Sequence, residues 1–341
     1  MSLPLIAEID SLKLINNAKV VKSKIKNAKF CAVVKSNAYG HGLVEVSNFL
    51  YSYVDCFAVA LTSEAYALRV AGIDKEILLL TPSFYQDIEK LIEYEITLSI
   101  STIKELIAVI EISNKMQKFA YVHISLNTGM NRLGFKNLND INYIIKLVNE
   151  SGKYIKITGA FSHFCKAENK KLTDKQFYTF LYLVQPLKEY NNDITLHISS
   201  SGGLLKDKKY HLDMVRVGIL LYGYKPYEKC DISVERVMKI KAPVLQKHTN
   251  IKGENLLYGD DITLNSSAYI IRLGYADGFF RQGIKHSLTN LCMDLSAVKK
   301  ITNKDYTVVL DDATFYAKKY DTCVYEILTS VSKRAKRIYL K

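Results

Sequence analysis

A lysine stands at the end of a strongly apolar segment near the N-terminus. Residues 30–34, FCAVV, form an apolar, partly β-branched run that predicts a strand buried on both faces, and Lys35 follows it directly. Parallel α/β folds place chemistry at the carboxyl ends of strands, where a desolvated lysine has a lowered pKa. Lys35 is therefore a candidate Schiff-base amine and general base. The alternative is a surface lysine just past a strand end.

Two later segments contain residue types that bind a phosphate, which needs backbone N–H groups at a Gly-containing turn and hydroxyls. HISSSGG (197–203) directly follows one apolar run, and VRVGI (215–219) lies within another. Barrels customarily bind phosphates at the ends of such strands. Without further context, a Ser-Gly segment is equally consistent with an ordinary turn.

Two strings resemble the motifs of a known family. VVKSNAYGHG (33–42) resembles the lysine motif of the alanine racemase family, usually written VVKANAYGHG, and differs from it only at Ser36. LGYADGFFR (273–281) resembles the second motif of that family. Weaker strings follow in the expected order, so the resemblance covers the whole chain.

The resemblance implies an enzyme that interconverts L-alanine and D-alanine and supplies D-alanine for peptidoglycan. Its cofactor would be pyridoxal 5'-phosphate (PLP), bound as a Schiff base on Lys35. Racemisation needs a base on each face of the α-carbon, and the family pattern gives these roles to Lys35 and Tyr275. In the family this tyrosine reaches the partner subunit's cofactor, so a homodimer with shared active sites is expected.

The resemblance also implies which residues surround the cofactor. Arg216 would face the pyridine nitrogen and leave it unprotonated, because a guanidinium has no acceptor, so the ring would be a weakened electron sink. His163 and Arg216 would be the cationic neighbours that stabilise the phenolate of Tyr275. The expected cofactor-binding residues are Lys35, Tyr39, His163, Ser201, Arg216, Gly218, Ile219 and Tyr339.

Recognition of a substrate carboxylate is expected from an arginine and backbone donors. Arg132 in NTGMNRLGF matches the family's substrate-binding arginine, and Met293 in CMD matches a residue whose backbone contacts the carboxylate. Ser125 and Asn127 replace a lysine and an aspartate that the family pattern often has before this arginine. Something else must then orient Arg132, such as a bound anion or Asn127.

These residues need a scaffold that brings strand ends together. Apolar runs bounded by turn residues alternate with stretches of helical spacing, which predicts an α/β fold with a (β/α)8, TIM-like barrel. A doubly wound sheet has the same alternation. The predicted strands span residues 30–34, 57–60, 77–80, 96–100, 119–126, 155–161, 194–198 and 215–223.

The pattern changes beyond residue 228. Short β-branched segments replace the helical stretches, and helical spacing returns only in YEILTSVSKRAKRIY (325–339). We therefore expect a PLP-binding barrel over residues 1–228 and a smaller, mostly β domain over residues 229–341. Residues 1–10 are strand-like and are expected to pair with the second domain.

Composition argues against several other classes of protein. The 47 Lys and Arg residues, against 34 Asp and Glu, are dispersed and form no nucleic-acid-binding motif, so no nucleic acid is expected as a partner. No apolar run approaches the length of a membrane span, and the N-terminus lacks the basic segment of a signal peptide. The 6 cysteines form no CxxC pair, which argues against a metal site and disulfides and favours a cytoplasmic protein.

Other functions remain open. The departures near Arg132 leave room for an amino-acid racemase of broader specificity, for example toward serine. A PLP-binding protein without turnover would resemble only the barrel half, whereas this chain retains the second domain with Tyr275. A PLP decarboxylase is expected to need an acidic partner on the pyridine nitrogen, and Arg216 argues against it.

Overall fold

The chain forms two compact units in the computed structural model, which describes residues 4–249, 253–259, 267–331 and 333–341. The barrel unit comprises Ile15–Lys35 and Leu43–Val234, and the β unit comprises Met1–Leu14, Ser36–Gly42 and Glu235–Lys341. The chain therefore leaves the barrel unit directly after Lys35. No helix among the described residues has the length and apolar character that crossing a membrane requires.

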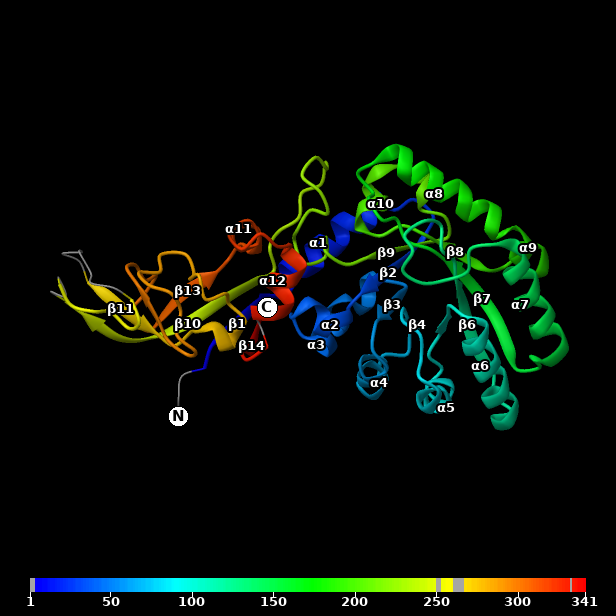
Figure 1. Ribbon diagram of the computed structural model, residues 1–341, viewed down its shortest axis with the longest axis horizontal. Coiled ribbons are helices and arrows are strands. Elements are labelled where there is room, and N and C mark those ends of the chain that lie inside the picture. The colour runs from blue at the N-terminus through cyan, green and yellow to red at the C-terminus, as the bar shows by residue number, and fades with distance from the viewer. Residues whose placement is uncertain (1–3, 250–252, 260–266, 332) are drawn as a thin grey trace. The chain divides into compact units, whose positions relative to one another are not determined.

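The barrel unit is built on two four-stranded parallel sheets (Figure 1). Their strand orders are β4-β3-β2-β9 and β5-β6-β7-β8. The strands are short and almost entirely buried, because their apolar residues face the core on both sides. They are β2 (Lys29–Val33), β3 (Cys56–Val59), β4 (Ile77–Leu79), β5 (Leu98–Ile100), β6 (Ala120–Ser125), β7 (Ile155–Phe161), β8 (Thr195–His197) and β9 (Met214–Val217).

Hydrogen bonds join the two sheets at both ends. Leu78 and Thr97 form a parallel bridge between β4 and β5. At the other junction, the amide of Arg216 in β9 donates to the carbonyl of Ser199, just beyond β8, at 3.0 Å. The sheets thus close into a ring of parallel strands, which confirms the predicted barrel over the doubly wound alternative.

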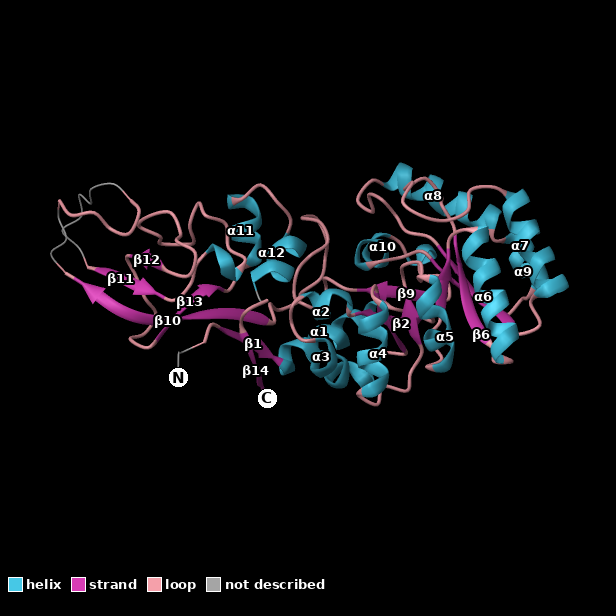
Figure 2. Cartoon of the chain, turned by 60° about the horizontal axis from the view of Figure 1, so that its bottom comes forward, coloured by secondary structure: helices cyan, strands magenta, loops and turns pink. Residues whose placement is uncertain are grey.

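Amphipathic helices surround the strands (Figure 2). In α7, Asn137 caps the N-terminus by accepting the amide of Asp140 at 2.9 Å, and Ile141, Ile144 and Val148 recur on the buried face. The helices that follow α1 (Ser11–Lys24) are α3 (Leu43–Leu50), η1 (Tyr51–Tyr53), α4 (Thr62–Val70), α5 (Tyr85–Glu93), α6 (Ile103–Met116), α7 (Leu138–Ser151), α8 (Lys170–Leu183), α9 (Gln185–Tyr190), α10 (Ser201–Lys206) and η2 (Lys208–Tyr210).

The strand predicted over residues 215–223 is too long, because β9 ends at Val217. The residues beyond it form tight turns, in which the amide of Leu221 donates to the carbonyl of Gly218 at 2.9 Å. Their side chains are as buried as those of a strand. Hydrophobicity alone could not distinguish the two conformations.

The β unit is built on one six-stranded sheet (Figure 2). Its order is β12-β11-β10-β1-β14, and β13 also pairs with β10. Strand β1 pairs antiparallel with β10 and parallel with β14. The elements are β1 (Ile6–Asp10), β10 (Met238–His248), β11 (Ala268–Ile271), η3 (Tyr275–Asp277), β12 (Ser296–Val298), β13 (Tyr306–Leu310), α11 (Ala313–Lys319), α12 (Val324–Val331) and β14 (Lys336–Leu340).

The helix predicted over residues 325–339 is correct only in its first half. Helix α12 ends at Val331, residue 332 lies outside the described residues, and β14 begins at Lys336. Side chains in β14 alternate between exposed and half-buried, as in an edge strand. The last residues join the sheet because β1 offers them backbone partners.

Residues 36–39 form a turn with left-handed backbone. Their φ angles are 55°, 55°, 53° and 53°, a conformation that costs L-residues about 1–2 kcal/mol each. The turn, labelled α2 (Lys35–Tyr39), is held by two side chains of β14. Arg337 Nε donates to the carbonyl of Gly40 at 3.0 Å, and the Tyr339 hydroxyl donates to the carbonyl of His41 at 3.1 Å.

The loop after β6 returns to its own strand. The amide of Phe135 donates to the carbonyl of Ser125 at 3.0 Å, and the amide of Asn127 donates to the carbonyl of Phe135 at 2.8 Å. Gly134 permits this close return, because its φ is 101° and a Cβ there would lie 2.5 Å from the Ser125 carbonyl oxygen. The base of the loop that carries Arg132 is thereby fixed.

Gly134→Ala should destabilise the protein more than Gly72→Ala. Gly72 also has a positive φ, but no atom lies within 4 Å of a Cβ placed there, so it serves as the control for backbone strain alone. We expect a loss of about 1 kcal/mol for Gly72→Ala and about 2–4 kcal/mol for Gly134→Ala, where a steric clash is added. Urea unfolding measures both, and equal losses would contradict the close return of the loop.

Candidate active site

Lys35 lies just beyond the carboxyl end of β2, and its side chain is partly exposed. Burial lowers the pKa of its amine, and the guanidinium groups of Arg132 and Arg216 lower it further, while the carboxylate of Glu64 acts in the opposite direction. More of the Lys35 amine is therefore neutral and nucleophilic near pH 7 than in an ordinary lysine.

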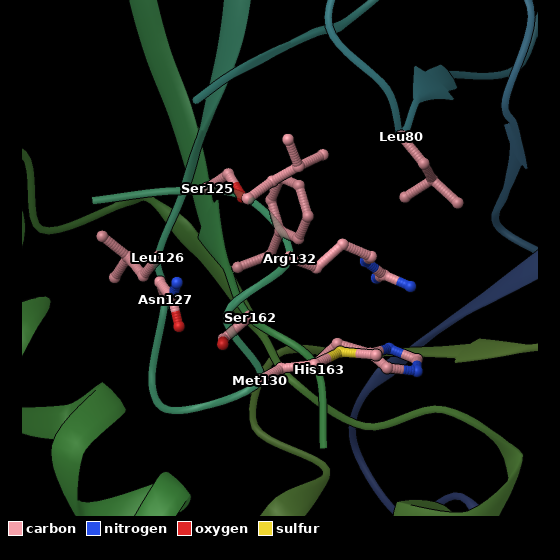
Figure 3. A pocket seen from close by; sticks show the side chains of 10 residues that line it. Leu80, Ser125, Leu126, Asn127, Met130, Arg132, Ser162 and His163 are labelled. Carbon is pink, nitrogen blue, oxygen red and sulfur yellow. The ribbon is translucent and has the colours of Figure 1, made fainter. Parts of the chain in front are cut away.

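Arg132 is exposed on the loop between β6 and α7, and it lines a pocket with His163. Figure 3 shows the two side chains extending to the same side of this pocket. The Oδ1 atom of Asn127 accepts the amides of Gly129 and Asn131 at 3.1 Å each, so Asn127 shapes the loop. In the described part of the chain no hydrogen bond or ion pair engages Arg132, which leaves its charge for an anionic ligand.

His163 follows β7 and lies beside the arginines. Burial lowers the pKa of its imidazole to about 3, and the charges of Arg216, Arg132 and Lys35 contribute. The ring is therefore neutral at pH 7 and acts as a hydrogen-bonding group. The prediction that His163 supplies a positive charge for Tyr275 is wrong, because neighbouring cations disfavour its protonation.

Arg216 points from β9 into the interior of the barrel unit and is only 4% exposed. Its Nη2 donates to the carbonyl of Ser162 at 2.7 Å, and its Nη1 donates to Nδ1 of His197. The guanidinium also lies over the face of Phe161, 5.5 Å from the ring centroid. Burial lowers the pKa of Arg216 to about 10, which leaves the side chain charged at pH 7.

Ser201 and Gly218 come together where β8 and β9 end. The amide of Gly218 donates to Oγ of Ser201 at 3.3 Å, and the neighbouring Ile219 is buried. The backbone around Ser201 is closely packed, since a Cβ on Gly203 would lie 2.6 Å from the Ser199 hydroxyl. A hydroxyl and backbone donors are thus gathered at one rim of the barrel.

Gln176 supports this site without any signal in the sequence. It lies on α8 and is 1% exposed. Its Nε2 donates to the carbonyl of His163 at 3.1 Å and to the hydroxyl of Thr128 at 3.3 Å, while its Oε1 accepts the amide of Cys165 at 3.1 Å. One buried amide therefore ties the loop after β6 to the loop after β7.

Glu64 is a second supporting residue that sequence reasoning missed. Its carboxylate accepts the amides of Ala60 and Leu61 at 3.1 and 3.2 Å at the start of α4. A glutamate in the first helical turn is an ordinary capping residue. Only the structure places this negative charge near Lys35.

The β unit brings Tyr275 and Met293 together. The amide of Tyr275 donates to the carbonyl of Cys292, and the amide of Ala276 donates to the carbonyl of Met293, both at 3.0 Å. Gly274 allows this approach, because a Cβ there would lie 2.0 Å from the Met293 carbonyl oxygen. The side chains of Tyr275 and Met293 are 42% and 56% exposed in the single chain.

Asp277 anchors the turn that carries Tyr275. Its buried carboxylate accepts the amide of Gly274 at 3.0 Å and faces Arg334 at 3.5 Å and Arg272 at 3.8 Å. The two guanidinium groups hold the carboxylate of Asp277 in place, and its hydrogen bond to Gly274 fixes the backbone of the GYADG string. The tyrosine therefore extends from a rigid turn.

Tyr39 and Tyr339 also belong to the β unit. Tyr39 packs against Tyr325 with ring centroids 5.9 Å apart, and burial raises the pKa of its phenol. The hydroxyl of Tyr339 donates to the carbonyl of His41. Both residues support the left-handed turn that follows Lys35, whereas the other expected cofactor-binding residues lie in the barrel unit.

Two family models match the chain across both units. The model described as "Alanine racemase, N-terminal domain" matches residues 9–226, and "Alanine racemase, C-terminal domain" matches residues 237–339. The chain belongs to the alanine racemase family. Alanine racemase of Methanococcus maripaludis is 35% identical over 376 residues and covers 100% of both chains. That of Clostridium tetani is 31% identical over 99% of this chain and 96% of its own.

Solved structures of alanine racemases share the fold. The alanine racemase of Clostridium difficile 630 superposes with a TM-score of 0.93 at 30% identity, covering 100% of this chain and 96% of its own. The alanine racemase of Bacillus anthracis, solved with bound L-Ala-P, gives a TM-score of 0.91 at 26% identity over the same shares of the two chains. The (β/α) barrel with a mostly β second domain is thus the fold of alanine racemases.

Within the alanine racemase family pattern, this chain departs at the loop that carries Arg132. Ser125 lines the pocket beside Arg132 where the pattern often has a lysine. Among the described residues Asn127 makes no hydrogen bond to the guanidinium, and its Oδ1 instead organises the loop backbone. Arg132 is thus positioned through its main chain.

Arg132→Gln should raise the pKa of the Lys35 amine, because the arginine's positive charge lowers it. The pH at which acylation of Lys35 reaches half its maximal rate should then move to higher pH. Peptide mass spectrometry of cofactor-free protein treated with acetic anhydride measures this rate. Lys136→Gln removes an exposed charge from the same loop and should leave the profile in place. An unchanged or lowered midpoint in Arg132→Gln would exclude the electrostatic coupling.

Proposed function

We propose that this protein is a PLP-dependent alanine racemase that interconverts L-alanine and D-alanine. The observation that carries the proposal is the gathering of Lys35, Arg132 and Arg216 in a chain of this family. After burial, the charges of Arg132 and Arg216 lower the pKa of Lys35, and that of Arg132 also lowers the pKa of Arg216, while the carboxylate of Glu64 acts in the opposite direction at Lys35. Such a site favours ligands that bring negative charge, as a phosphate and an amino-acid carboxylate do.

The side chains present fit the cofactor's chemistry. The Ser201 hydroxyl and the backbone of Gly218 and Ile219 suit a phosphate, and the lowered pKa of Lys35 suits a covalent bond to an aldehyde carbon. His163 would supply a further polar contact, and Tyr39 and Tyr339 would complete the set. When bound, the cofactor withdraws electrons from the α-carbon and so makes its proton removable.

Arg216 would limit how strongly the cofactor withdraws electrons. A guanidinium only donates hydrogen bonds, so Arg216 would leave a ring nitrogen that accepts from it unprotonated. The partners found for Arg216 hold the guanidinium in one orientation. A weaker electron sink favours rapid return of the proton over side reactions such as transamination.

Lys35 and Tyr275 would hold and move the proton. Tyr275 Oη would take the α-proton of L-alanine, and Lys35 Nζ would deliver a proton to the opposite face; D-alanine reverses the roles. The lowered pKa of Lys35 brings proton exchange at Nζ closer to neutral pH. Arg132 and the backbone of Met293 would bind the substrate carboxylate.

The active assembly in this proposal is a homodimer with shared sites. Tyr275 and Met293 are both substantially exposed in the single chain, which supports a role toward a second copy. The enzyme would supply D-alanine for peptidoglycan in the cytoplasm. All six cysteines are free, as a reducing compartment requires.

Lys35→Ala and Tyr275→Phe should each reduce kcat for alanine by about 10³-fold or more, because each removes one of the two bases. Tyr258→Phe is the control, since Tyr258 is 87% exposed in the same unit and has no proposed role. Chiral chromatography of D- and L-alanine measures the rates. Full activity in either of the first two variants would refute the mechanism. If kcat/KM for serine exceeds that for alanine, the broader racemase becomes the better description.

Mixing the two inactive variants should restore activity if the sites are shared. A mixed dimer has one site with both defects and one with an intact Lys35 and Tyr275. After dissociation and random reassociation, about a quarter of the unaltered activity should return. No recovery, despite mixed dimers shown by native mass spectrometry, would mean that each chain builds its own site.

A further inference from the structure

A file of buried polar side chains runs from Arg216 into the interior of the barrel unit. Nη1 of Arg216 contacts Nδ1 of His197, and Nε2 of His197 lies 2.9 Å from Nδ1 of His123. His197 and His123 are 0% and 1% exposed. His197 is also stacked on Phe161, with centroids 5.2 Å apart and an interplanar angle of 8°. Two buried imidazoles therefore extend from Arg216 into the interior of the barrel unit.

The direction of the hydrogen bonds along this file is fixed by Arg216. A guanidinium cannot accept a hydrogen bond, so Nδ1 of His197 must be the acceptor and its proton must sit on Nε2. That N–H then donates to Nδ1 of His123, which leaves the proton of His123 on Nε2. Burial and the charge of Arg216 lower the pKa of both imidazoles, so both rings are neutral.

Glu76 stands where this file ends. It precedes β4, and its Oε1 lies 3.7 Å from Nε2 of His123. This distance is longer than a hydrogen bond, so the contact is an attraction between the carboxylate and the N–H dipole. Burial raises the pKa of Glu76, while Lys29, the hydroxyl of Thr97 and Arg69 act in the opposite direction.

The neighbouring backbone makes room for His123. A Cβ on Gly159 in β7 would lie 2.5 Å from Nε2 of His123. The register between β6 and β7 also shifts between Val122 and His123. Both features place the imidazole in the interior with its Nε2 edge toward Glu76.

We propose that Glu76 is a positioning residue for the active site: its carboxylate attracts the Nε2–H of His123, stabilises the tautomers in which His197 accepts from Arg216, and so helps to hold the guanidinium in its orientation. The effect that Glu76 is expected to have on catalysis rests on the proposed function. The proton positions themselves do not depend on that function. Glu76 contacts neither substrate nor cofactor in this proposal.

The test uses protein labelled with ¹⁵N-histidine and saturated with pyridoxal 5'-phosphate. Long-range ¹H–¹⁵N spectra should show the proton on Nε2 of both His123 and His197. In Glu76→Leu, which removes the carboxylate, the resonances of both rings should shift, and kcat should fall about two- to tenfold with little change in KM. Glu76→Gln keeps a polar side chain of the same size without the charge and should give smaller shifts.

Asp74→Asn is the matched control. Asp74 lies two residues before Glu76, and its carboxylate also interacts electrostatically with Arg69. It accepts a hydrogen bond from the hydroxyl of Tyr51, however, and does not face His123. A proton on Nδ1 of His123 in the unaltered protein would overturn the proposal. The proposal would also be overturned if the His197 resonances shifted no more in the two Glu76 variants than in Asp74→Asn. If the unaltered protein fails to racemise alanine while the proton positions are as stated, the proposed function fails and the file of hydrogen bonds stands.

Discussion

The positive charge of Arg216 inside the barrel unit is the constraint on which the candidate site depends. No carboxylate among the described residues pairs with it, and its contacts are the carbonyls of Ser162 and Ile198, the imidazoles of His197 and His163, and the face of Phe161. A buried charge without a counter-charge is unfavourable. The groups around Arg216 must therefore accept hydrogen bonds from it or remain neutral. Burial, together with the charge of Arg216, lowers the pKa values of His163, His197 and Lys35, so the two imidazoles are neutral and Lys35 is more easily deprotonated. The same imbalance makes the site receptive to anions.

Local backbone strain follows Lys35 directly in the chain. Four consecutive residues after Lys35 adopt left-handed backbone; the amide of Gly40 donates to the carbonyl of Ser36 at 3.0 Å within this turn, and contacts from outside also support it. Those contacts come from β14, at the other end of the chain, through Arg337 and Tyr339. Lys35 therefore ends the part of the barrel unit that contains β2, and the strained turn that follows it belongs to the β unit.

The loop carrying Arg132 shows how a departure from a family pattern is accommodated. Asn127 caps the loop backbone, Gly134 allows its close return, and Gln176 ties it to the loop of His163. Each of these contacts acts on the main chain and leaves the guanidinium free of protein partners within the described residues. Charge recognition and loop geometry are thus provided by different side chains.

The sequence by itself determined the α/β alternation, eight predicted strands and the place of Lys35 after one of them, because buried parallel strands appear as apolar runs. Two nearly intact family strings favoured the barrel, and the closure between β8 and β9 decided against a doubly wound sheet. The residue pattern gave the wrong length for β9 and the wrong structure for the last residues, since buried turns and edge strands share the composition of their neighbours. Tertiary structure decided the neutral state of His163, the support from Gln176 and the file from Arg216 to Glu76. Protonation and buried hydrogen bonds depend on distances between groups far apart in the chain, and no local pattern of residues records those distances.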